Sequence, residues 1–238
     1  MALPKLNNDN PIYETIIPST KETVKFRPFL VKEQKNLLIA MESKDTKQIL
    51  NAMLGCIESC SSLTNVKKLA TFDVDYMFTQ IRSKSVGETS DIVTECTSCK
   101  HNNTVKIDLS QIKMDTDSVK DTVIPLNDQI SVTMQYPSYE DMMKNNSIFS
   151  EDGKAIDVIL DTIVSCIHSV QTEDENVMIK DEPKEEVENF INSLTTEQLD
   201  KINAFVDSMP TLEHQHDYTC ENCGENKTLI LRGLQDFF

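Results

Sequence analysis

Two Cys-x-x-Cys motifs constrain the fold of this chain more than any other feature of its sequence. They are Cys96-Thr-Ser-Cys99 and Cys220-Glu-Asn-Cys223, with 120 residues between them. The two-residue spacing lets both thiolates of a tight turn face one metal ion, and two such turns complete a tetrahedral four-thiolate shell. We therefore predict one structural zinc ion with Cys96, Cys99, Cys220 and Cys223 as its ligands.

The residues that follow each motif favour a ribbon-like setting for this zinc. β-prone runs come after both motifs, at Thr104–Ile107 and Thr228–Leu231. Each motif is then a zinc knuckle within a hairpin, and a saturated four-thiolate site acts mechanically, as a clasp that closes a long loop. The alternatives are unrelated surface thiols or a redox-active pair.

Other possible ligands leave further alternatives open. One of three histidines near the knuckles could replace a cysteine: His101, His214 or His216. Cys56 and Cys60 are spaced i, i+4 on a predicted helix, and Cys166 lies on another apolar stripe. We expect these three to be buried free thiols, although a second metal site is the alternative.

The net charge and the number of cysteines exclude several classes of protein for this chain. The net charge is −16 and no basic stripe is present, so we expect no nucleic-acid partner. We find no signal peptide and no apolar run of about 18 residues, so we expect a cytoplasmic protein without a membrane anchor. Seven cysteines, an odd number, are then thiols or metal ligands rather than a disulfide framework.

Hydrophobic periodicity in the first part of the chain predicts a hairpin followed by helices. β-rich runs at Ile12–Ile17 and Thr23–Phe26 flank a turn at Pro18. Apolar residues then keep helical spacing in three segments, at about 30–43, 45–60 and 73–83. Asp45 is placed to cap the second of these helices.

The second part alternates strands and helices. We predict strands on both sides of the first knuckle, a hairpin from Val123–Leu126 and Ile130–Met134, and a strongly amphipathic helix over Ala155–Val170. The acidic stretch from Thr172 to Glu186 is interpreted as a flexible connection. A capping box at Thr195–Gln198 begins a final helix that ends before Pro210.

These patterns predict an α+β fold: a helical body with β-hairpins and a discontinuous zinc-ribbon-like unit. We expect an N-terminal hairpin and helices at 1–88, a zinc unit built from 89–110 and 212–238, and a hairpin and helical insertion at 111–211. The sequence contains no Gly-rich phosphate loop, nucleophile elbow or His-Glu-x-x-His motif. We therefore expect no enzymatic activity, and an enzyme would require a zinc with an exchangeable ligand.

Several of these segments resemble the baseplate hub assembly protein family of T-even-type contractile-tailed bacteriophages. The resemblance is carried by Leu3–Leu6, Pro11–Glu14, Val24–Glu33, Phe72–Phe78, Ile81–Glu88, the two knuckles and Leu231–Phe238. It implies a non-enzymatic factor needed to build the central hub, with hub and other tail proteins as partners. It also implies a location in the host cell cytoplasm during assembly, after which the protein is either incorporated into the tail baseplate or released. The alternative is a zinc-ribbon adaptor for nucleic acid or the transcription machinery.

Two short segments each allow two interpretations, one as a packed part of the fold and the other as a contact site for a partner. Residues Arg82–Glu88 are either a packed helix end with Gly87 as its stop, or a polar contact for a hub protein. The terminal pair Phe237–Phe238 is either an aromatic anchor or a cover for the second knuckle.

Overall fold

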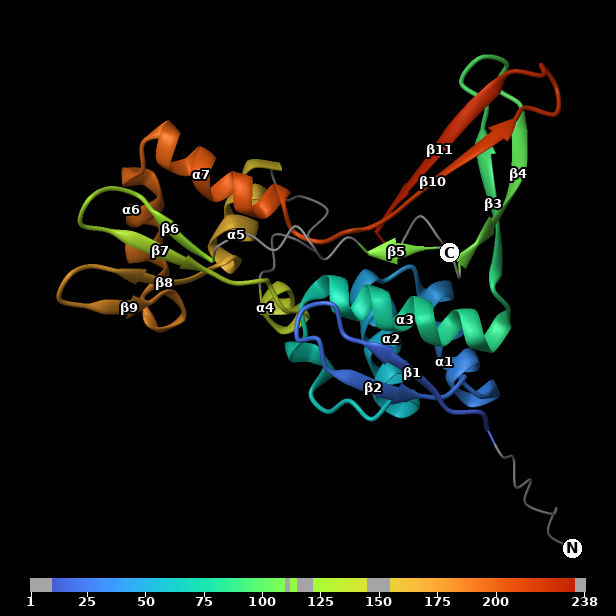
Figure 1. Cartoon of the computed structure of the whole chain (residues 1–238), viewed down its shortest axis with the longest axis horizontal. Helices are drawn as coiled ribbons and strands as arrows, with labels where there is room; N and C mark the ends of the chain where they lie inside the picture. The colour runs from blue at the N-terminus through green and yellow to red at the C-terminus, as the bar shows by residue number, and fades with distance from the viewer. Residues whose placement is uncertain (1–9, 110–111, 115–121, 145–154, 234–238) are drawn as a thin grey trace, which may run out of the picture. The chain divides into compact units, whose positions relative to one another are not determined.

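The protein is described by a computed structural model, which covers residues 10–109, 112–114, 122–144 and 155–233 (Figure 1). The chain divides into two compact units. Unit 1 comprises Met1–Val66, Phe72–Met114 and Thr211–Phe238, and unit 2 comprises Lys67–Thr71 and Asp115–Pro210. Helices and small antiparallel sheets occur together, as expected of an α+β chain. Within the described ranges, no helix has the length and apolar character needed to cross a membrane.

The first part of unit 1 is a hairpin followed by helices, as predicted. The hairpin pairs β1 (Tyr13–Ile16) with β2 (Thr23–Phe26). The helices are α1 (Val31–Ser43), α2 (Thr46–Cys60) and α3 (Thr71–Val86), with a short 3-10 turn at Val66–Lys68 between the last two. Asp45 caps α2, because its Oδ1 accepts the backbone N–H of Lys47 at 2.8 Å.

Helix α1 begins with a buried carboxylate. The Glu33 side chain is 5% exposed and accepts the Leu30 backbone N–H at 2.9 Å, which satisfies a free donor of the first turn. The guanidinium of Arg27 lies 3.0 Å from the other carboxylate oxygen. Although burial alone raises the pKa of Glu33, the hydrogen bonds from Arg27 and Leu30 outweigh it and the net shift is downward.

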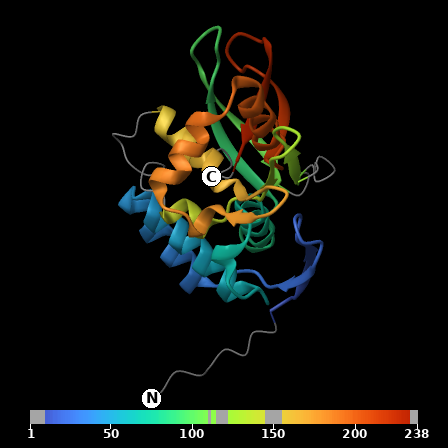
Figure 2. The ribbon, with the colours of Figure 1, turned by 90° about the vertical axis from the view of Figure 1, so that its left-hand side faces the viewer.

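Two hairpins make up the rest of unit 1. Strand β3 (Thr89–Glu95) pairs with β4 (Asn102–Asp108), and β10 (Leu212–Thr219) pairs with β11 (Asn226–Arg232). The short strand β5 (Lys113–Met114) pairs with β10. Figures 1 and 2 show the two hairpins side by side, with their tips together.

The two hairpins contact each other through packed side chains and not through backbone hydrogen bonds between their strands. β3 and β4 form a two-stranded sheet, whereas β11, β10 and β5 form a separate three-stranded sheet. Residues from both hairpins nevertheless bury one apolar cluster, which includes Val105 and Ile107 from β4, Leu212 from β10 and Leu231 from β11. The paired hairpins are therefore held by this cluster along their length and by the knuckles at their tips.

The end of α3 packs in part against the rest of unit 1. Gly87 follows the last helical residue with a φ of +125°, a conformation that residues with a Cβ rarely adopt. Lys84 lies 2.5 Å from Glu88 and 5.6 Å from the centre of the Tyr13 ring. Ser85 Oγ accepts the Phe29 backbone N–H at 2.9 Å. Lys84 and Ser85 thus contact neighbouring elements of unit 1, whereas Val86, Gly87 and Glu88 are exposed. The packing role applies to the first part of this segment, and a contact role for its exposed end stays a prediction.

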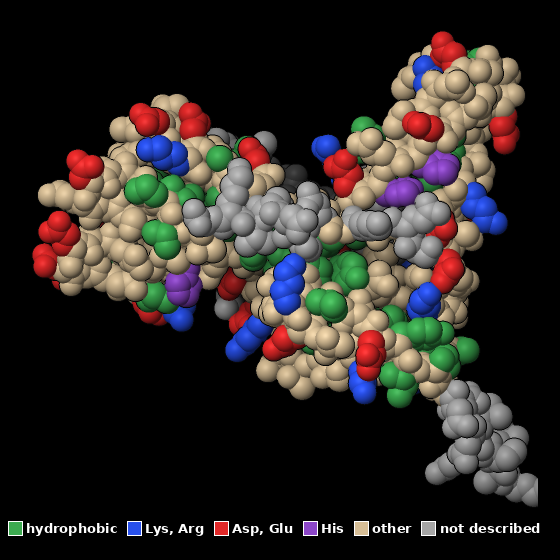
Figure 3. All heavy atoms as spheres, in the orientation of Figure 1, with side chains coloured by type: hydrophobic (Ala, Val, Ile, Leu, Met, Phe, Trp, Pro, Cys, Tyr) green, Lys and Arg blue, Asp and Glu red, His purple; other side chains and the backbone are tan. Residues whose placement is uncertain are grey.

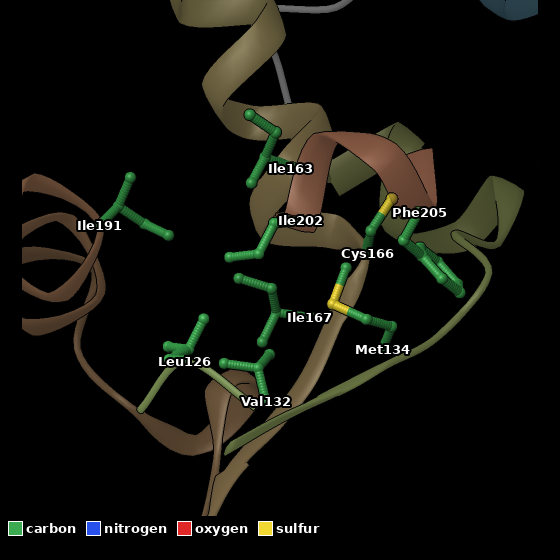
Figure 4. Close-up of a cluster of buried hydrophobic side chains, with 9 residues drawn as sticks. All are labelled: Leu126, Val132, Met134, Ile163, Cys166, Ile167, Ile191, Ile202 and Phe205. Carbon is green, nitrogen blue, oxygen red and sulfur yellow. The ribbon is translucent and has the colours of Figure 1, made fainter. Parts of the chain in front are cut away.

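Unit 2 packs helices against a four-stranded antiparallel sheet. The sheet order is β6 (Val123–Pro125), β7 (Ser131–Met134), β8 (Ile167–Gln171) and β9 (Asn176–Met178). The helices are α4 (Tyr139–Lys144), α5 (Ala155–Ser165), α6 (Lys184–Ser193) and α7 (Thr196–Asp207). Figure 4 shows the buried core that they enclose, with Ile167 and Ile202 at its centre. The predicted hairpin is confirmed as β6 and β7.

The predicted helix over Ala155–Val170 is wrong in its last part. The helix α5 ends at Ser165, and the chain continues as β8 from Ile167. Strand pairing accounts for the difference, because Val170 lies opposite both Val132 of β7 and Val177 of β9. These residues combine apolar spacing with β propensity, and the sheet partners decide between the two.

The acidic stretch from Thr172 to Glu186 is not the flexible connection that its charge suggested. It contains β9, a 3-10 turn at Ile179–Asp181 and the start of α6. Val187 and Ile191 of α6 are buried, so its charged residues form the outer face of a packed helix. The capping box that begins α7 is confirmed: Thr195 and Gln198 each bond the other's backbone N–H.

Candidate metal centre

The four predicted cysteines lie together at the tips of the two hairpins. The Sγ atoms of Cys96 and Cys223 are 3.8 Å apart, and those of Cys99 and Cys220 are 3.6 Å apart. All four sulfur atoms lie within 4.8 Å of one another. Cys96 and Cys220 are buried, whereas Cys99 is half-buried and Cys223 exposed.

The same turn builds both knuckles. In the first, the Lys100 N–H bonds the Cys96 carbonyl at 2.9 Å, and the Cys96 N–H bonds the His101 carbonyl at 2.8 Å. In the second, the Gly224 N–H bonds the Cys220 carbonyl and the Cys220 N–H bonds the Glu225 carbonyl, both at 2.9 Å.

Both turns need a left-handed residue directly after the second cysteine. Lys100 has a φ of +60° and Gly224 a φ of +72°. The second knuckle uses the residue type best suited to this conformation, and the first tolerates a lysine there. The two matching turns present their thiols in equivalent ways.

The spacing of the sulfurs fits a tetrahedral metal ion. Zinc–thiolate bonds of about 2.3 Å place the sulfurs of a four-thiolate site about 3.8 Å apart. The measured separations of 3.6 and 3.8 Å agree with this edge length, and they are far beyond the roughly 2.0 Å of a disulfide. Four thiolates in this arrangement are a donor set that suits zinc.

Hydrogen bonds favour the thiolate form, which binds a metal, at two of the four cysteines, Cys220 and Cys99. The pKa of Cys220 is lowered to about 6, chiefly because the Cys223 backbone N–H donates to its sulfur, with a further contribution from Asn222. The pKa of Cys99 is also lowered, chiefly by the Asn222 side chain and then by the backbone of His101. Asn222 thus connects the second knuckle to a sulfur of the first. At Cys223 the Glu225 backbone N–H lowers the pKa, but desolvation and the neighbouring sulfurs outweigh it and raise the pKa to about 12.

An exposed polar network also joins the two knuckles. Ser98 of the first knuckle donates a hydrogen bond to the Glu225 carboxylate, and Lys227 donates to Ser98 Oγ at 2.8 Å. Lys227 also pairs with Glu225 at 2.8 Å. The pKa of Lys227 is raised, first by Glu225 and further by the nearby sulfurs of Cys96 and Cys223. This ammonium therefore offsets negative charge at the cluster.

A buried amide makes a further link between the knuckles. Asn103 of β4 is 2% exposed, and its Oδ1 accepts the backbone N–H of Glu221 at 2.9 Å. Its Nδ2 donates to the His101 carbonyl at 3.0 Å. One side chain of the first hairpin thus holds the backbone of the second knuckle beside Cys220.

The other candidate ligands lie outside this cluster. The group of described side chains that could share an ion contains the four cysteines and none of His101, His214 or His216. The last two stack on β10, with ring centres 6.1 Å apart. Cys56 and Cys60 are buried in α2, where no described residue adds a third ligand, and Cys166 is buried in unit 2.

Sequence reasoning missed the polar residues that connect the knuckles. Asn103 had a recognisable signal, because it occupies an inward position of β4 in line with Val105 and Ile107. Ser98, Glu225 and Lys227 resemble ordinary surface residues in the sequence. The segments Leu3–Leu6 and Phe237–Phe238 lie outside the described residues.

Comparison with known proteins gives two matches to phage tail components. A family model described as T4 bacteriophage base plate protein matches residues 10–238. The baseplate hub assembly protein gp26 of Enterobacteria phage T4 is 23% identical over 212 residues, which cover 89% of this chain and 90% of that protein. No solved structure matches the chain.

Proposed function

The chain belongs to the T4 bacteriophage base plate protein family, and from this membership we propose that it is needed to assemble the central hub of a phage baseplate. The observation that carries the proposal is the near full-length match to a protein whose name describes hub assembly. In this proposal the chain works in the host cell cytoplasm, binds hub and other tail proteins, and binds no nucleic acid.

The four-cysteine cluster has a mechanical role in this proposal. Zinc held by Cys96, Cys99, Cys220 and Cys223 would join the tips of two hairpins that are distant in sequence. A four-thiolate shell is saturated and has no position for a water or substrate. This supports a non-enzymatic protein in which the metal stabilises unit 1.

The exposed apolar side chains of α1 are the surface that we assign to partner binding. Val31, Leu38 and Met41 are 79%, 54% and 51% exposed, and their spacing places them along one side of the helix. The opposite side carries the buried residues Glu33 and Ala40. Figure 3 shows hydrophobic side chains gathered where α1 lies in Figure 1.

Charge helps to identify the partner of this surface. Lys32 and Lys35 are exposed on α1, in a chain whose net charge is −16. A second copy would bring these lysines against the same lysines. An apolar surface with an acidic rim on another tail protein is the better complement.

The proposal is tested by removing the gene from the phage that encodes this chain and restoring it with an affinity-tagged copy. We expect baseplates without a central hub in the deletion, recovery with the tagged copy, and co-purification of the tagged chain with hub proteins. Normal baseplates in the deletion, together with no bound tail protein, would exclude the hub-assembly role. Salt-dependent binding of purified chain to DNA or RNA would favour the adaptor alternative instead.

A further inference from the structure

The Asn103 amide is the one buried polar side chain that links the two knuckles directly in the described part of the chain. It lies on β4 between two exposed neighbours, Asn102 and Thr104, at a position where the strand otherwise carries valine and isoleucine. A buried amide is costly unless its hydrogen-bonding groups are satisfied, so its presence there calls for an explanation.

The amide nitrogen and the amide oxygen of Asn103 each make a hydrogen bond, one to the first knuckle and the other to the second. The Nδ2 donates to the His101 carbonyl, which also accepts the Cys96 N–H of the first knuckle. The Oδ1 accepts the Glu221 N–H, next to Cys220 of the second knuckle. We propose that Asn103 is a positioning residue that aligns the two knuckles, so that the four thiols are brought together before a metal binds.

The environment of Asn103 makes it a stronger determinant of alignment than the other polar links. Ser98, Glu225 and Lys227 also connect the knuckles, but their contacts face water, which competes for the same groups. The Asn103 side chain is 2% exposed, so an unmade bond leaves a buried amide donor or acceptor without a partner. Misaligned knuckles would therefore be disfavoured even without zinc.

The inference adds to the proposed zinc clasp but does not require it. Amide hydrogen exchange of the full-length chain, with metal removed by a chelator, measures alignment directly at the Glu221 N–H. We expect this amide to be protected in the wild type and to exchange roughly tenfold faster in Asn103→Ala, the loss that one buried hydrogen bond predicts. Asn103→Asp retains an acceptor for the Glu221 N–H and should restore part of the protection.

Asn102→Ala is the matched control, because it removes the same side chain from the adjacent, exposed position of the strand. It should leave Glu221 protected. Amides within the β10–β11 pairing report whether each variant is folded. Equal Glu221 exchange in the wild type and in a folded Asn103→Ala variant would overturn the proposal.

A second measurement distinguishes the proposed role of Asn103 from the proposal that the four cysteines bind zinc. Cobalt binding, followed by its thiolate charge-transfer absorption, should be several-fold weaker in Asn103→Ala, whereas the four-thiolate spectrum at saturation should be unchanged. If the wild type binds no metal, the zinc proposal is wrong. The protection of the Glu221 N–H would then still test whether Asn103 aligns the knuckles. Unaltered cobalt affinity in a variant that exchanges faster at Glu221 would overturn the role in assembling the thiols.

Discussion

The sulfur of Cys99 lies 3.6 Å from that of Cys220, although 120 residues separate the two in sequence. Cys96 and Cys223 make the second close pair, so each knuckle places its sulfurs against those of the other. A shared ion would therefore close a loop that contains nearly all of unit 2, and neither knuckle alone supplies a complete site.

We predict that one zinc ion binds per chain and that the four cysteines are its only protein ligands. The reason is the agreement between the sulfur spacing and a tetrahedral four-thiolate shell. Elemental analysis of freshly purified protein gives the stoichiometry, and cobalt substitution gives the ligand type. A metal-free preparation that also fails to take up zinc, or a spectrum with nitrogen or water ligands, would contradict this prediction.

We predict that Cys220→Ser loosens both hairpins. Loss of one thiolate weakens a metal site that couples distant segments, so the effect should reach the first knuckle. Hydrogen exchange should show reduced protection in β10–β11 and also across Ile92–Ile107, with β1, β2 and the N-terminal helices largely unchanged. Cys166→Ala, which removes a buried thiol in unit 2, should leave both hairpins protected. A loss confined to residues 218–231 would mean that the knuckles are independent.

We predict that Glu33→Gln lowers the free energy of unfolding by roughly 1–3 kcal/mol at neutral pH, because it removes the charge that Arg27 pairs with. The pKa of Glu33 is lowered in the folded state, so its contribution is complete above the unfolded value of about 4.3 and disappears as the pH falls through the lower folded value. Chemical denaturation between pH 3 and pH 7 should therefore show a weaker pH dependence in the variant. An identical dependence in both proteins would contradict the prediction.

We predict that Leu38→Glu prevents binding of hub proteins without unfolding the chain. The side chain is 54% exposed, so the substitution should change stability by no more than about 0.5 kcal/mol. Ile159→Glu, at a 53% exposed position in unit 2, is the matched control and should retain binding. Co-purification from infected cells measures both variants. Equal recovery of hub proteins would place the contact elsewhere on the surface.

Local patterns predicted the elements whose stability depends mainly on nearby residues. The turn chemistry of the knuckles, the Asp45 cap and the Thr195 capping box are encoded within a few positions, and the structure contains all of them. The four cysteines could be grouped because their spacing has a direct geometric meaning. The structure confirms one part of the zinc prediction, namely that the four cysteines lie together in space.

The remaining features depend on partners that are distant in sequence. Ile167–Gln171 has apolar spacing that also suits a helix, and its pairing with β7 and β9 makes it a strand. Val187 and Ile191 are buried, and Ile191 belongs to the core of unit 2, so α6 packs there despite its acidic flank. The bond between Asn103 and Glu221 spans 118 positions, so no local pattern could have predicted it.

The separation of the knuckles also sets the order in which the protein can fold as it leaves the ribosome. At synthesis rates of about 5–20 residues per second, the 120 residues between Cys99 and Cys220 take roughly 6–24 s to be made. Nearly all of unit 2 is translated within that interval and can become compact first. During the same interval Cys96, Cys99 and Asn103 have already been made, but the second knuckle that they contact has not. Completion of unit 1 therefore waits for the last strands of the nascent chain.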